Sequence, residues 1–178
     1  MAIVPDGITP DDKDWTWVVH QPCPECRYDA AHITRERVPP MILDNAASWR
    51  QVLARDDVHQ RPTIDQWSPL EYACHIRDVF RIYDYRLSLI LSTDDPTYPN
   101  WDQDKTAIDE RYGEQDATVV ADELQAAADQ IASRFAAVHG DQWSRTGNRS
   151  DGARFTIDTF ARYLLHDVVH HIYDVSEC

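Results

Sequence analysis

Three histidines in this chain have a spacing that could hold a metal ion. His166 and His170 stand four residues apart near the C-terminus, and His75 lies in a separate segment, residues 74–78. Residues four apart lie one turn apart on the same face of a helix. Two such imidazoles can share a divalent ion, and a third from a facing helix can complete a three-histidine site. Three protein ligands leave one coordination position open, which is typical of a catalytic metal.

Two carboxylates are spaced so that they could orient these imidazoles. Asp78 follows His75 by three residues, and Asp174 follows His170 by four. A metal-bound imidazole presents its other N–H on the side away from the ion, where a carboxylate can accept it. We therefore expect Asp78 and Asp174 to accept hydrogen bonds from the metal-bound imidazoles of His75 and His170. Neutral imidazole suits zinc, nickel, iron and copper, so the residues alone do not select the metal.

Two other pairs compete with this interpretation. Asp167 and His171 have the same helical spacing on a neighbouring face. Cys23 and Cys26 have the spacing of half a zinc ribbon, but the other two of the four cysteines do not form a second such pair. The cysteine pair is therefore interpreted as a structural knuckle or an incidental pair of reduced thiols. Alternatively, one of these thiols closes the metal site as a fourth ligand, and the metal is then structural.

Composition limits the classes of function. A chain of 178 residues fits a single domain, and 17 Lys and Arg against 31 Asp and Glu give a formal net charge of −14. Negative charge disfavours binding to nucleic acids and to anionic membranes. No apolar run is long enough to cross a bilayer, and the acidic N-terminus has no apolar signal segment. We expect a cytoplasmic protein with reduced cysteines and a small-molecule substrate, without a nucleic-acid or membrane partner.

Four amphipathic segments must position these residues. Apolar side chains recur at helical spacing over about residues 40–55, 68–92, 116–139 and 156–175. The second segment has the clearest start, because Ser68, Pro69 and Glu71 match a capping box with proline at the first helical position. A short strand is expected at residues 15–19. The pattern predicts one all-α domain, a four-helix bundle over residues 38–176 preceded by an irregular extension over residues 1–37.

The segments around the histidines resemble those of a known family. Trp67 precedes His75 by eight residues, Asp78 follows three residues later, and residues 166–170 form a His-x-x-x-His sequence. This arrangement resembles the DinB-like superfamily, which includes YfiT-like metalloenzymes and the N-terminal domain of mycothiol-dependent maleylpyruvate isomerase. The resemblance extends over about residues 38–176.

The resemblance implies both a fold and an activity. It implies a four-helix bundle without simple up-and-down order, and one divalent ion, usually zinc or nickel, on His75, His166 and His170. Some relatives use low-molecular-weight thiols as co-substrates, and relatives often form homodimers. We therefore expect a metal-dependent thiol transferase or isomerase that acts on a small molecule. A metal-dependent hydrolase and a non-enzymatic metal-binding bundle linked to stress response are the alternatives, and a vacant metal position in an open pocket would favour an enzyme.

Overall fold

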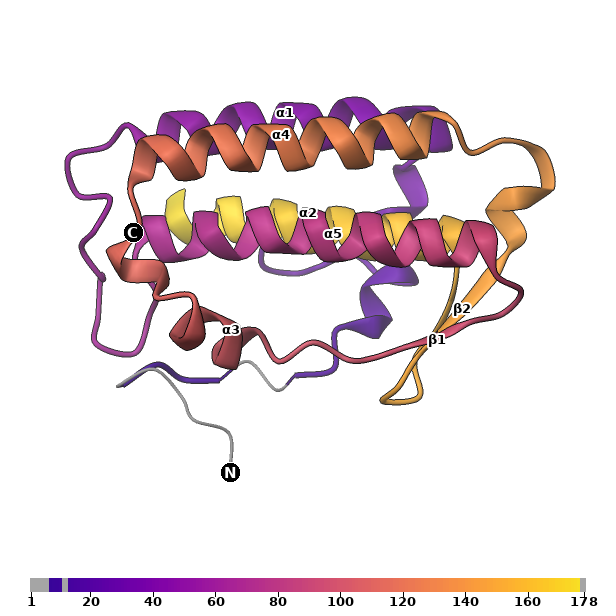
Figure 1. Cartoon of the computed structure of the whole chain (residues 1–178), viewed down its shortest axis with the longest axis horizontal. Helices are drawn as coiled ribbons and strands as arrows, with labels where there is room; N and C mark the ends of the chain where they lie inside the picture. Colours follow the sequence, from indigo (N-terminus) through magenta and orange to yellow (C-terminus); the bar gives the residue numbers. More distant parts are fainter. Residues whose placement is uncertain (1–6, 11–12, 177–178) are drawn as a thin grey trace.

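The computed structural model describes residues 7–10 and 13–176. Four long helices form a bundle, as predicted (Figure 1). They begin and end within three residues of the predicted limits. These helices are α1 (Val38–Leu53), α2 (Pro69–Ser92), α4 (Ala117–Ala136) and α5 (Ile157–Ser176), and a short helix, α3 (Gln103–Asp109), lies between α2 and α4 in the sequence.

Local sequence explains where two of the long helices begin. At the start of α2, the Ser68 hydroxyl accepts a hydrogen bond from the backbone N–H of Glu71 at 3.2 Å. The Glu71 carboxylate accepts one in return from the N–H of Ser68 at 2.8 Å. Asp116 caps α4 in a similar way by accepting hydrogen bonds from two backbone N–H groups of its first turn. These side chains satisfy donors that a helix leaves free at its N-terminus.

The helices do not follow the simple order in which chain neighbours are also spatial neighbours. α4 packs against α1 and α2, and α5 packs against the same two helices. The order around the bundle is therefore α1, α4, α2, α5 (Figure 1). The bundle thus lacks simple up-and-down order, as the resemblance implied. Each long helix contributes a large, fully buried aromatic side chain to the shared core, and each such burial contributes roughly 2 to 3 kcal/mol. These side chains are Trp49, Phe80, Phe135 and Phe160.

A small sheet joins the loops at one end of the bundle. It has the order β1 (Thr97–Tyr98), β2 (Thr146–Arg149) and β3 (Arg154–Thr156), with β1 parallel and β3 antiparallel to β2. Gly147 of β2 faces α2 so closely that an added Cβ would lie 2.7 Å from Cγ1 of Ile90. The sequence indicated loops here, because strands of two to four residues are too short to show an alternating pattern.

The N-terminal extension contains no strand within its described part, so the strand expected at residues 15–19 is wrong. Thr16–Val19 is instead a 3-10 helix, and the Asp14 carboxylate accepts a hydrogen bond from the N–H of Thr16 at 2.9 Å. The indole rings of Trp15 and Trp17 stack on each other, and this segment packs against α5. The other 3-10 helices are Ala30–His32, Arg35–Arg37, Tyr112–Glu114 and Gly140–Ser144. No described helix is both long and apolar enough to span a membrane.

Candidate metal centres

Helix α5 presents two pairs of potential metal ligands on adjacent faces. Within each pair the residues are four apart, and the two pairs are offset by one residue, which turns them about 100° apart around the helix. The structure gives each pair different partners, and the potential ligand atoms of each group lie within 4.8 Å of one another. The first group, here the His75 site, comprises His75, Asp167 and His171; the second, here the cysteine site, comprises Cys23, Cys26, His166 and His170.

The predicted three-histidine set is thus divided between two groups. His75 projects from α2 toward the face of α5 that carries Asp167 and His171. The sequence had offered these two residues as an alternative to His166 and His170 with the same helical spacing. His166 and His170 instead meet the cysteines of the N-terminal extension. Both pairs have helical spacing, so the sequence could not show which face of α5 is turned toward α2.

His75 has the environment of a metal ligand. Its side chain is 1% exposed, and neither ring nitrogen has a hydrogen-bond partner among the described residues. Its ring stacks on Trp101 with centroids 5.2 Å apart and planes 4° apart. Burial lowers the pKa of His75 to about 3, so the imidazole is neutral. A buried nitrogen without a partner is costly, and coordination of an ion would remove that cost.

The other two residues of the His75 site already lie at metal-ligand spacing. Nε2 of His171 is 3.2 Å from Oδ1 of Asp167, and tetrahedral zinc with ligands at about 2.0 to 2.1 Å separates them by about 3.3 Å. Burial opposes protonation of His171, but hydrogen bonds to Asp167 and Asp174 raise its pKa to about 10. Ion binding would displace the proton on Nε2 of His171, while the N–H of Nδ1 would still donate its hydrogen bond to Asp174.

The two predicted supporting carboxylates have different surroundings. Asp174 accepts a hydrogen bond from Nδ1 of His171 at 2.8 Å, and its other oxygen lies 3.6 Å from Nε2 of His170. Asp78 has other partners: it accepts hydrogen bonds from Arg77 at 2.9 and 3.0 Å, from the Tyr112 hydroxyl at 2.6 Å and from Arg81 at 3.2 Å. No hydrogen bond joins it to His75 in the described part of the chain. Arg77 and Tyr112 donate hydrogen bonds to the Asp78 oxygens, and the spacing of residues along one helix could not reveal these partners.

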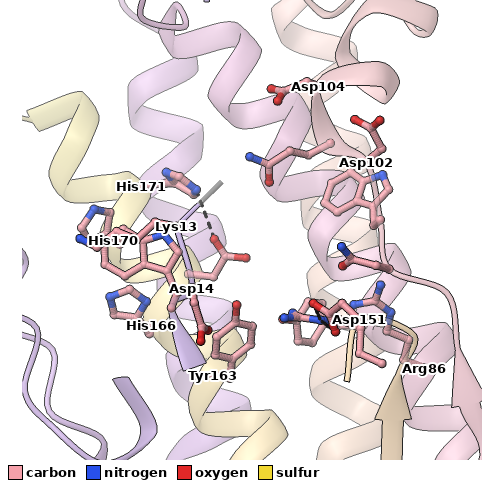
Figure 2. A pocket seen from close by; sticks show the side chains of 17 residues that line it. Lys13, Asp14, Arg86, Asp102, Asp104, Asp151, Tyr163, His166, His170 and His171 are labelled. Carbon is pink, nitrogen blue, oxygen red and sulfur yellow. Dashed lines mark hydrogen bonds and ion pairs between the residues drawn. The ribbon is translucent and has the colours of Figure 1, made fainter. Parts of the chain in front are cut away.

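A cavity of about 380 Å³ opens beside the His75 site. Figure 2 shows His171 and Tyr163 on one side of this cavity, with Arg86 and Asp104 on the other. Trp101, which covers His75, also lines it. The cavity is large enough for a small metabolite.

Arg86 brings a positive charge to this cavity. Arg86 is only 5% exposed. Its guanidinium donates a hydrogen bond to the Pro99 carbonyl at 2.9 Å and lies over the Tyr98 ring, 4.9 Å from the ring centroid. Among the described residues, no carboxylate lies within ion-pair distance of it. Sequence reasoning missed Arg86, although one signal was present: the arginine stands three residues after Tyr83 and four before Ile90, on the apolar face of α2. An unpaired buried cation is costly and favours an anionic ligand.

Comparisons with known proteins agree with the fold and the sequence motifs. The family model of the DinB superfamily matches residues 43–175. Among solved structures, YfiT from Bacillus subtilis, described as a probable metal-dependent hydrolase with an unusual four-helix bundle topology, is similar with a TM-score of 0.71. The two are 15% identical, and the match covers 80% of this chain and 86% of YfiT. The comparison with curated proteins found no match. Because the family model matches residues 43–175, most of the length of the chain, this chain belongs to the DinB superfamily.

Proposed function

We propose that the protein is a metal-dependent hydrolase of a small anionic molecule and that the His75 site is its reaction centre. One observation carries the proposal: His75, Asp167 and His171 converge beside an open cavity, and their group contains no fourth protein ligand among the described residues. Two histidines and one carboxylate form a ligand set found in catalytic zinc sites, where a coordination position stays open. The same set also suits iron, and elemental analysis of the purified protein would identify the metal.

The residues around the ligands have separate roles in this proposal. A divalent ion bound here would lower the pKa of a coordinated water molecule toward neutrality and polarise a substrate oxygen. Trp101 holds the His75 ring by stacking, and Asp174 fixes His171 through its Nδ1–H. Arg86 offers its guanidinium to the anionic group of the substrate from the other side of the cavity (Figure 2). The description of YfiT as a probable metal-dependent hydrolase supports this choice of reaction.

Transfer of a small thiol is the second candidate reaction. The cavity of about 380 Å³, which Asp167 and His171 line, would bring a small thiol to the His75 site. None of its lining residues is a cysteine, so the thiol would be a co-substrate. An open metal position favours the thiolate form of such a molecule, as it favours ionised water.

Metal analysis of single variants tests the site. Untagged protein with His75→Ala or His171→Ala should lose one equivalent of divalent metal relative to wild type, while His59→Ala, at an exposed position, should retain it. Full metal content in both site variants would reject the His75 site.

Activity assays then separate the two reactions. A hydrolase should cleave small carboxylate- or phosphate-bearing esters or amides without added thiol and should lose activity in His75→Ala. In a thiol transferase, Co(II)-loaded protein should gain sulfur-to-cobalt absorption when a small thiol is added, and His75→Ala should abolish the gain. A metal-loaded protein with neither response would support the non-enzymatic interpretation.

A further inference from the structure

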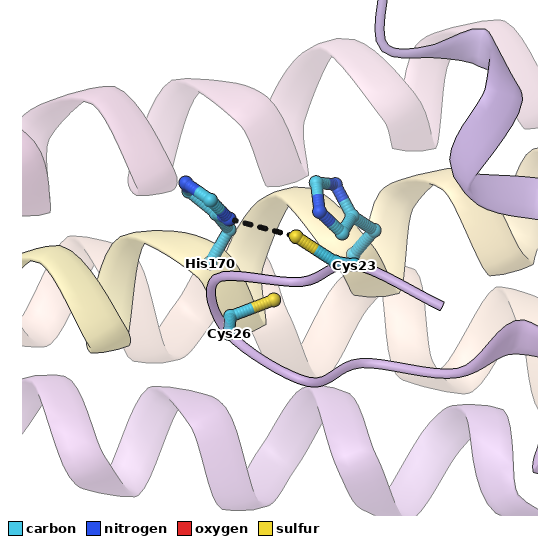
Figure 3. Close-up of side chains that lie close together, drawn as sticks. Cys23, Cys26 and His170 are labelled. Atoms are coloured by element: carbon cyan, nitrogen blue, oxygen red, sulfur yellow. Dashed lines mark hydrogen bonds between the residues drawn. The ribbon is translucent and has the colours of Figure 1, made fainter. Parts of the chain in front are cut away.

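The second group of metal ligands lies where the N-terminal extension crosses α5. Figure 3 shows Cys23 and Cys26 on one turn of the extension beside the helix that carries His170, with Sγ of Cys23 joined to His170. We propose that Cys23, Cys26, His166 and His170 bind a structural zinc ion, separate from the ion of the His75 site. The proposal does not depend on the reaction proposed above, because the two groups have no ligand in common.

The backbone around the cysteines forms a tight turn that suits metal binding. The N–H of Cys23 donates to the carbonyl of Tyr28 at 2.8 Å, and the N–H of Arg27 donates to the carbonyl of Cys23 at 3.0 Å. Arg27 adopts the left-handed conformation, with a φ of 61°, directly after the second cysteine. The two sulfur atoms of this turn lie within 4.8 Å of each other. Two cysteines separated by two residues form half of many structural zinc sites.

The distances agree with a tetrahedral zinc site. Sγ of Cys23 lies 3.7 Å from Nδ1 of His170, and Zn–S and Zn–N bonds of about 2.3 and 2.0 Å place such ligands about 3.5 Å apart. All four potential ligand atoms lie within 4.8 Å of one another, so small side-chain movements would complete the site. Four protein ligands fill the coordination sphere and leave no position for a substrate. The ion would therefore hold the structure together and take no part in a reaction.

Burial and charge also support a zinc ion at the cysteine site. Cys23 is 1% exposed and His166 is 3% exposed, and Nε2 of His166 is buried without a hydrogen-bond partner among the described residues. Reduced thiols alone leave that nitrogen unsatisfied, whereas an ion gives it a ligand bond. Two thiolates also cancel the two positive charges of zinc, so the complete complex is neutral. A neutral complex avoids much of the cost of burying charge.

The surroundings of His170 would orient its ring for coordination. Its Nδ1 faces Cys23, while Nε2 lies 3.5 Å from Glu25 and 3.6 Å from Asp174. A carboxylate beside Nε2 favours the tautomer with the proton on Nε2 and leaves Nδ1 free to bind an ion. The Trp15 ring covers both histidines of the site, with its centroid 5.2 Å from that of His166 and 5.0 Å from that of His170.

The ion would also fix one wall of the proposed active site. Asp14 and Trp15 line the cavity and belong to the same extension as the cysteines. A zinc bridge from Cys23 and Cys26 to α5 would connect this extension to the helix that carries Asp167 and His171. The cysteine site would thereby hold the cavity wall in place.

Metal content and spectra of single variants test the proposal. Wild type loaded with Co(II) should bind two equivalents and show sulfur-to-cobalt charge-transfer absorption. Cys23→Ser and Cys26→Ser should each lose one equivalent and this absorption, whereas His75→Ala should lose the other equivalent and keep the absorption. Cys74→Ser is the matched control, because this buried thiol contacts the Tyr112 carbonyl and Gln115 and belongs to neither group. Absorption that persists in both Cys23→Ser and Cys26→Ser would overturn the proposal.

A measurement on the wild type covers the case in which those variants fail to fold. Zinc-loaded and chelator-treated protein would be treated with iodoacetamide, and the modified cysteines located by mass spectrometry. Zinc should protect Cys26, which is only half-buried and accessible to the reagent once the ion is removed. Equal alkylation of Cys26 with and without zinc, or a Co(II) spectrum without thiolate absorption, would refute the site.

Discussion

Asp174 accepts a hydrogen bond from Nδ1 of His171 at 2.8 Å, on the side of the ring away from Asp167. Its second oxygen is 3.6 Å from Nε2 of His170, in the other group of ligands. One carboxylate therefore stands behind a ligand of each proposed metal site. Because a carboxylate of this kind raises the basicity of the imidazole that it contacts, Asp174 should influence both sites.

Asp174→Asn should weaken metal binding at the His75 site about 10- to 100-fold, because the amide cannot replace the carboxylate behind His171. The loss at the cysteine site should be smaller, since Glu25 also faces His170. Competitive titration with a fluorescent zinc chelator would measure both affinities. Asp78→Asn is the control: its partners are Arg77, Arg81 and Tyr112, so metal affinity should stay at the wild-type value while stability falls. Equal losses of affinity in the two variants would contradict this assignment.

Tryptophan fluorescence should report the two sites separately. Trp101 stacks on His75, and Trp15 covers His166 and His170. Paramagnetic Co(II) quenches a nearby indole, so wild type should show two quenching phases in a titration. Trp101→Phe should reduce the phase that is lost in His75→Ala, and the remainder should come from Trp67, whose ring centroid lies 5.3 Å from that of His75. Trp15→Phe should likewise reduce the phase that is lost in Cys26→Ser, and the remainder should come from Trp17, which stacks on Trp15. A single phase that neither Trp variant alters would show that the ions bind elsewhere.

Arg86→Met should weaken the binding of small anions in the cavity. A charge-assisted hydrogen bond contributes roughly 1.5 to 3 kcal/mol, so we expect a loss of about 10- to 100-fold in affinity. Calorimetry with succinate and with inorganic phosphate would measure it, in wild-type metal-loaded protein and in His75→Ala to separate anion binding at the metal. Arg50→Met, which removes an exposed arginine paired with Asp122, should leave the affinity unchanged. Unchanged affinity in Arg86→Met would remove this arginine from the substrate site.

Glu71→Gln should lower stability in a pH-dependent way. Burial opposes ionisation of Glu71, but the bidentate Arg61 and the N–H of Ser68 together bring its pKa below the ordinary value of 4.5. A folded-state pKa below the unfolded one gives stability that is present above about pH 4.5 and is lost as the pH falls through the folded value.

Urea unfolding would measure this effect. At pH 7 the variant should be less stable than wild type by about 1 kcal/mol, the size of a typical net hydrogen bond. The difference should narrow as the pH falls below 4.5, because the unfolded chain then takes up the Glu71 proton, and it should level off once folded Glu71 is protonated at its lower pKa. Glu110→Gln, at an exposed position, should show no such narrowing. A difference that is constant from pH 7 to pH 3 would mean that the Glu71 charge does not stabilise the fold.

The sequence by itself determined the helices and the residue types of the candidate metal sites. Ser68, Pro69 and Glu71 fix the start of α2 through bonds within four residues, and such short-range signals can be read without the fold. Apolar spacing gave the other long helices to within three residues. The histidine, cysteine and carboxylate side chains of the candidate sites were all visible as pairs, because helical spacing and a two-residue gap are local properties.

Tertiary structure alone decided how those pairs combine. His166 with His170 and Asp167 with His171 have the same spacing, and the rotation of α5 about its axis determines which pair faces His75 on α2. That rotation depends on packing of apolar faces from all four long helices. Cys23 reaches His170 across 147 residues of chain, a contact that depends on where the extension packs against α5. Pairings between distant segments arise from the sum of many weak packing contacts, which no single motif encodes.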